Sequence, residues 1–163
     1  MARSEAFTLP ELLVVVAVVA ILAGIALGGE QEALARLQVE SASRRVVLGL
    51  ERGRSVAERL GRPCALSLNS EGWGEPSRGN LAACPGVVLS LGEGMESGEG
   101  LRLEHNLPAA VRFSSNGLVL DGGTVLVAHR ATELTRCVVV SLPLGVARVG
   151  FYSEGACRPD PTL

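Results

Sequence analysis

The strongest constraint in this sequence is an uninterrupted apolar run near its N-terminus. Residues 12–27 read LLVVVAVVAILAGIAL and contain no charged or polar side chain. With residues 7–10 before it and two glycines after it, the segment is long enough to cross a bilayer as a helix, which takes about 20 residues. A secretory signal peptide and a plain membrane anchor are the two ordinary interpretations of such a run.

The residues around the run fit neither interpretation well. Ala26, Leu27 and Gly28 offer the small residues of a signal-peptide cleavage site, but the preceding MARSEA holds one Arg and one Glu, so the positive start is weak. A plain anchor explains the hydrophobicity of the run, yet it does not explain the order FTLPELL at residues 7–13. A third interpretation is therefore needed.

The segment from Ala6 through Phe7-Thr8-Leu9-Pro10-Glu11 to Leu12 resembles the type IV prepilin signature. The resemblance implies that a prepilin peptidase cuts between Ala6 and Phe7 and that the new amino group of Phe7 is methylated. The leader would be residues 1–6, with Arg3 on the cytoplasmic side as the positive-inside rule favours. The family pattern usually has Gly before the cut, where this chain has Ala6.

Glu11 has a physical role in this interpretation. A carboxylate at the edge of an apolar segment costs several kcal/mol unless it is paired. The resemblance implies that Glu11, the fifth residue after the cut, meets the positive N-terminus of a neighbouring subunit and sets its axial register during assembly. The alternative is an acid lying in the headgroup region, and Phe7, Thr8 and Leu9 beside it favour the assembly role.

An amphipathic helix is predicted to follow the apolar run, over residues 30–62. Its apolar and small residues recur in steps of three and four, which places them on one helical face. They are Val39, Ala42, Val46, Leu50, Gly53, Ala57 and Leu60. Gly61 and Pro63 are typical of a helix end. We therefore expect a transmembrane stem helix over residues 7–29 and a second half that packs under a sheet.

The remaining residues, 63–163, predict a β-rich head outside the cytoplasm. Residues 64–68 alternate like a strand, whereas residues 69–86, with Trp73, and residues 92–100 have the composition of loops. Asn116-Gly117 and Asp121-Gly122 are typical hairpin turns. Further strands are predicted at residues 87–91, 110–113, 118–120, 124–128, 135–142 and 146–152. A long helix followed by an antiparallel sheet gives an α+β fold.

The head also resembles the FimT/GspH group of minor pilins and pseudopilins. The matching pieces are residues 111–113, 116–117, 123–124, 136–141 and 145–148, whereas residues 69–105 match nothing in that pattern. The resemblance implies the pilin fold, in which the N-terminal helix packs on the antiparallel sheet of the head.

Four cysteines, Cys64, Cys84, Cys137 and Cys157, lie in the predicted head. An even number in an exported domain predicts disulfides, for which three pairings exist. Local closure favours Cys64–Cys84 and Cys137–Cys157, because each bridge would close one loop-containing segment. Free buried thiols and a zinc site are the alternatives, but the Cys-x-x-Cys spacing typical of zinc is absent from the sequence. We expect no metal and no cofactor.

The resemblance thus implies a structural subunit that joins or primes a type IV pilus. Before assembly it would be held in the inner membrane by its single helix with its head in the periplasm, and its partners would be other pilins and a prepilin peptidase. A type II secretion pseudopilin of the GspH type is the alternative. His105 and His129 are the only near-neutral bases, and neither lies in a nucleophile motif, so we expect no enzyme.

DNA contact is a further hypothesis, connected with uptake in natural transformation and competence. Some FimT-like proteins bind DNA through a Gly-Arg-x-Arg motif near the C-terminus. Here the corresponding residues 145–148 read GVAR, so the first Arg is missing. Arg136, Arg148 and Arg158 are the candidates for phosphate contact.

Overall fold

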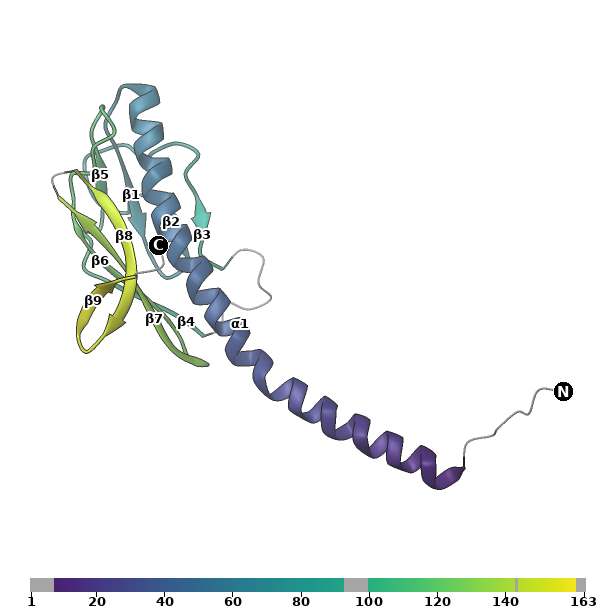
Figure 1. Ribbon diagram of the computed structural model, residues 1–163. Coiled ribbons are helices and arrows are strands. Elements are labelled where there is room, and N and C mark those ends of the chain that lie inside the picture. Colours follow the sequence, from purple (N-terminus) through teal and green to yellow (C-terminus); the bar gives the residue numbers. More distant parts are fainter. Residues whose placement is uncertain (1–7, 93–99, 143, 161–163) are drawn as a thin grey trace. The chain divides into compact units, whose positions relative to one another are not determined.

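The computed structural model describes residues 8–92, 100–142 and 144–160, with the backbone alone for residues 25–29. The chain divides into two compact units, Met1–Leu34 and Ala35–Leu163. The described residues form one helix, α1 (Leu9–Leu60), and nine strands (Figure 1). Residues 93–99, most of the expected second loop, lie outside the described residues.

Gly61 caps the C-terminus of α1, as predicted. Gly61 has a φ of +59°, in the left-handed region that glycine adopts without strain. Its N–H donates to the carbonyl of Glu58, and the Arg62 N–H donates to the carbonyl of Ala57. These two bonds satisfy the last carbonyls of the helix in a Schellman motif.

The strands of the second unit form two antiparallel sheets. One has the order β3-β2-β1-β5, and the other has the order β4-β6-β7-β8-β9. The bounds are β1 Cys64–Leu68, β2 Gly72–Gly74, β3 Leu89–Ser90, β4 Leu101–His105, β5 Val111–Phe113, β6 Gly123–His129, β7 Thr132–Ser141, β8 Val146–Ser153 and β9 Ala156–Pro159. The α+β fold, with a long helix packed on antiparallel sheets, is therefore confirmed.

The second half of α1 runs along the strands of the head (Figure 1). Most of its predicted apolar stripe belongs to the hydrophobic core. Val39, Ala42, Val46, Leu50, Gly53 and Ala57 are buried, whereas Leu60, at the helix end, is exposed. Two glycines bring the helix backbone directly onto aromatic rings. A Cβ on Gly49 would lie 2.0 Å from Cδ1 of Trp73, and one on Gly53 would lie 2.5 Å from Cζ of Phe113.

Trp73 lies in a strand and not in the loop that was predicted for residues 69–86. Trp73 belongs to β2, is 2% exposed, and donates its Nε1–H to the carbonyl of Val46 at 3.0 Å. The short strand went unpredicted because glycines flank the tryptophan on both sides. Strands β4 and β9 were also missed, and the strand predicted at residues 87–91 is only the two-residue β3.

The hairpin predicted at Asp121-Gly122 is wrong. Val119 forms an isolated bridge with Phe113, whereas β6 pairs with β4 and β7, so the chain passes here from one sheet to the other. The Asp121 carboxylate instead accepts hydrogen bonds from the backbone N–H, Nε and Nη2 of Arg112 at 2.8, 3.0 and 2.8 Å. Asp121 therefore joins the segment that connects the two sheets to β5.

Candidate assembly surfaces

The start of α1 places Glu11 in the first helical turn. The carbonyl of Thr8 accepts the N–H groups of Glu11 and Leu12 at 3.1 and 3.2 Å, which makes Thr8 the N-cap residue. Pro10 is tolerated there because the first turn does not need its missing N–H. The side chain of Glu11 is exposed, and its negative charge lies at the positive end of the helix dipole.

The helical turns after Glu11 expose apolar side chains on every side. The large apolar residues are between 50% and 64% exposed, and they are Leu12, Leu13, Val14, Val15, Val16, Val18, Val19, Ile21 and Leu22. A helix that is apolar on every side is normally buried against other apolar groups. The first unit thus presents a continuous apolar surface for such groups.

The predicted membrane span remains a prediction. Among the residues that the structure describes, no helix has a stretch both long and apolar enough to cross a membrane. Ala6 and Phe7, the predicted cleavage and methylation residues, lie outside the described residues together with the rest of the leader.

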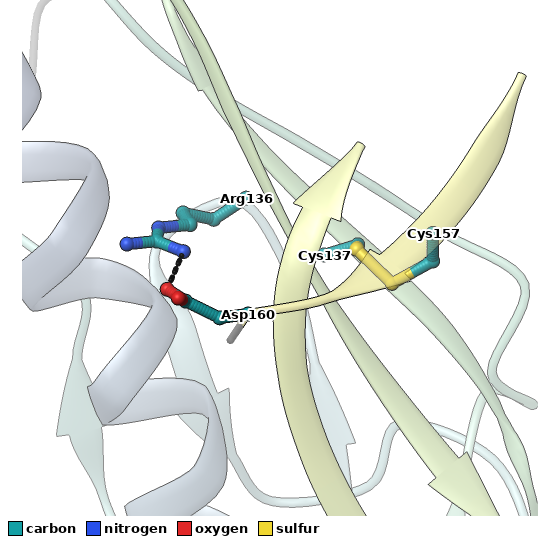
Figure 2. Close-up of a disulfide and its surroundings, with 4 residues drawn as sticks. All are labelled: Arg136, Cys137, Cys157 and Asp160. Carbon is teal, nitrogen blue, oxygen red and sulfur yellow. Dashed lines mark hydrogen bonds and ion pairs between the residues drawn. A yellow bond between two sulfur atoms is a disulfide. The ribbon is translucent and has the colours of Figure 1, made fainter. Parts of the chain in front are cut away.

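Arg136 is a structural residue of the head, and its assignment as a DNA contact is wrong. Its side chain is only 8% exposed and stacks on the ring of Phe151, with Cζ 3.8 Å from the ring centroid. Its Nη1 donates to Oδ2 of Asp160 at 2.7 Å (Figure 2). Its Nε donates to Oε1 of Glu40 on α1, also at 2.7 Å. The guanidinium therefore joins α1, β7 and the residue after β9.

The electrostatics of this cluster follow from its pairing. Burial lowers the pKa of Arg136, but hydrogen bonds and charge attraction from Asp160 and Glu40 outweigh burial and leave the pKa above its ordinary value. Arg136 is thus a permanent cation. No local sequence pattern predicts this cluster, because Glu40 and Asp160 are 96 and 24 residues away from Arg136.

The other two arginines proposed for DNA contact lie on the surface. Arg148 is exposed on β8, and Arg158 on β9 is exposed and forms an ion pair with Glu154. The strand register places Arg158 on the same face of the sheet as Arg136, because both pair with Phe151, and it places Arg148 on the opposite face. DNA contact by Arg148 and Arg158 remains a prediction.

Both disulfides favoured by local closure are present. Cys64 is bonded to Cys84 and Cys137 to Cys157, with Cα–Cα distances of 5.0 and 6.0 Å. Each bond spans 20 residues. The first joins β1 to the segment before β3, and the second joins β7 to β9.

An exposed apolar helix with an acid in its first turn, followed by a helix-on-sheet head, defines the class of type IV pilin-like proteins. Residues 1–27 match the prokaryotic N-terminal methylation motif, and residues 42–144 match the type II transport protein GspH. The second match covers more than half of the chain, so the chain belongs to the GspH family. It is a minor pilin or pseudopilin of the kind found in type IV pili and type II secretion. No curated protein and no solved structure gave a significant match.

Proposed function

We propose that this subunit enters a filament through the helix that begins at Leu9, after cleavage between Ala6 and Phe7 and methylation of Phe7. The observation that carries the proposal is the apolar surface of residues 12–22, which is exposed on every side of the helix. The match of residues 1–27 to the N-terminal methylation motif supports the processing step. Removal of one such side chain from water contributes about 1.5–3 kcal/mol, which favours placing this helix in lipid or against other apolar helices. Within the membrane, bundling with similar helices rests on van der Waals packing between them.

Glu11 supplies the specificity that an apolar surface lacks. Apolar packing tolerates many axial offsets, because one Val or Leu replaces another with little loss. A carboxylate at a fixed turn accepts the positive amino group of a neighbouring subunit at one offset only, and an unpaired carboxylate there is costly. Glu11 thus sets the register of the incoming subunit.

Before assembly, the same helix holds the subunit in the inner membrane with its head in the periplasm. The two disulfides support this location of the head, because disulfides persist in oxidising compartments such as the periplasm. The prepilin peptidase acts on the cytoplasmic side, where the leader with Arg3 lies.

The filament that we propose is a type IV pilus, which the subunit joins or primes. A type II secretion pseudopilus is the second candidate, and the match of residues 42–144 to a type II transport protein favours it. Deletion of the gene separates the two. Loss of surface pili with normal secretion supports the pilus, and loss of secretion with normal pili supports the pseudopilus.

Mass spectrometry of the N-terminus tests the processing step. The subunit is purified from the membrane of its own host, and its first peptide is expected to begin at N-methylated Phe7. A variant with Ala6→Gly should be processed in the same way, whereas a bulky Ala6→Trp should leave the leader in place. A mature chain that begins near Gly29, or that keeps residues 1–6 in a working strain, would contradict the proposal.

A further inference from the structure

The two disulfides of the head lie in different surroundings. Cys64 and Cys84 are each 3% exposed and belong to the hydrophobic core. Cys137 is fully buried on β7, but its partner Cys157 on β9 is only partly buried (Figure 2). Both cysteines of the first disulfide are therefore buried, whereas the second disulfide has one buried and one partly exposed cysteine.

Cys157 lines an open hollow of about 400 Å³ on the five-stranded sheet. Its lining includes Glu104, Thr124, Leu126 and Tyr152. Side chains alternate between the faces of a strand, so Thr124 and Leu126 lie on the face opposite the buried residues of β6. We call this the outer face, and a reagent in solution reaches Cys157 from it.

We propose that Cys137–Cys157 is a site of thiol–disulfide exchange with a dithiol, and that exchange releases β9. An external thiolate attacks Sγ of Cys157, a new S–S bond forms, and the electron pair of the old bond leaves on Cys137, which takes up a proton. The second thiol of the reagent then displaces Cys157 as a thiolate, which is protonated in turn. The dithiol is oxidised to a disulfide, and the two cysteines are reduced to thiols.

The position of the disulfide explains why β9 depends on it. Neighbouring residues of a strand point to opposite faces, so Cys137 holds Cys157 on the outer face while Arg136 holds Asp160 on the core face (Figure 2). The two bonds anchor the segment from Cys157 to Asp160 at both ends. Strand β9 is four residues long and is hydrogen-bonded only along β8, so it is an edge strand with little else to retain it.

Gly150 shows that β9 is fitted closely to this arrangement. It pairs with Cys137 on one side and with Pro159 on the other. A Cβ at Gly150 would lie 2.2 Å from the carbonyl oxygen of Arg158 and 3.3 Å from Sγ of Cys157. Release of β9 would uncover the edge of β8 for pairing with another strand. Both strands lie within residues 145–160, which are outside the match to the GspH family.

Timed labelling tests the exchange. The full chain in detergent micelles is treated with dithiothreitol, free thiols are trapped with N-ethylmaleimide, and the labelled peptides are quantified by mass spectrometry. Cys137 and Cys157 are expected to be labelled at least about tenfold faster than Cys64 and Cys84, because thiol exchange requires access to a sulfur. Equal labelling rates for all four cysteines, or faster labelling of Cys64 and Cys84, would overturn the proposal.

Hydrogen–deuterium exchange tests the release of β9. After selective reduction, and in a Cys137→Ser/Cys157→Ser variant, the amides of Ala156, Cys157 or its replacement, and Arg158 are expected to exchange at least about tenfold faster. The amides of Val125 and Val127 in the core serve as the internal control and should not change. Unchanged exchange in β9 after reduction would overturn its release. Neither result depends on the filament that the subunit joins, so the proposed function is tested separately.

Discussion

The two parts of helix α1 share a backbone conformation and differ in what surrounds their side chains. Between Leu12 and Leu22, in the first unit, the large apolar residues are at least 50% exposed. In the second unit, Val39 and Val46 are fully buried and Leu50 is 2% exposed. The two parts therefore have the same secondary structure and differ in how far their apolar side chains are buried. The second part stabilises the head of its own chain, and the first part leaves its large apolar side chains exposed.

The polar residues of the two parts follow the same division. In the second part, Glu40, Arg45 and Arg54 bind partners in the head, namely Arg136, the carbonyl of Ser90 and the carbonyl of Gly117. In the first part, Glu11 is exposed in the first helical turn. The head thus supplies partners for the polar groups of one part, and assembly supplies the partner for Glu11 under the proposed function.

A matched pair of glycine substitutions, one in each part of α1, should test this difference between the two parts most clearly. Gly49→Ala drives a methyl group into the ring of Trp73 and should lower the free energy of unfolding of the head by about 1–3 kcal/mol. Gly24→Ala meets nothing within 4 Å and should change that free energy by less than about 0.5 kcal/mol. Denaturant unfolding in detergent, followed by near-ultraviolet circular dichroism, measures both. Equal effects of the two substitutions would contradict the division of the helix.

A smaller effect is expected at the surface of the head, where Arg112 pairs with Asp121. Hydrogen bonding by Arg112 holds the pKa of Asp121 below its ordinary value of 3.8. The pair therefore stabilises the head at pH values above 3.8, and this stabilisation is lost as the pH falls through the lowered pKa. Asp121→Asn should cost up to about 1 kcal/mol at pH 7 and progressively less as the pH falls through the lowered pKa of Asp121.

Unfolding of the wild type and of Asp121→Asn at pH 7 and at pH 2 measures this pH dependence. Glu104→Gln, at an exposed carboxylate of β4, is the matched control and should show no comparable difference. An Asp121→Asn effect that is equally large at pH 2 would show that the pair does not act through its charge.

Periodic features of this chain could be predicted from the sequence, and features built by distant residues could not. The buried stripe from Val39 to Ala57 follows from its spacing, and the two disulfides follow from local closure. The sequence predicts a loop at Trp73, because a three-residue strand with a glycine on each side of the tryptophan carries too short a pattern to detect.

The errors at Asp121 and Arg136 have a shared cause. Asp121-Gly122 has the composition of a turn, but the carboxylate is bound by Arg112 while the chain changes sheets. Arg136 is a residue type that commonly contacts phosphate, but in the fold its guanidinium forms ion pairs with Glu40 and Asp160. The contacts of both side chains depend on partners outside their immediate sequence neighbourhood, nine residues away for Asp121 and 96 and 24 residues away for Arg136. No local sequence pattern reports these partners.

The most direct test of the central claim is the incorporation of a Glu11 variant into filaments. Filaments are sheared from cells that express wild-type protein, Glu11→Gln or the matched surface control Glu104→Gln, and the processed subunit is quantified in filament and membrane fractions. We predict that Glu11→Gln is processed normally and accumulates in the membrane, with at least about tenfold less subunit in filaments, whereas Glu104→Gln behaves as wild type. Normal incorporation of Glu11→Gln would contradict the account.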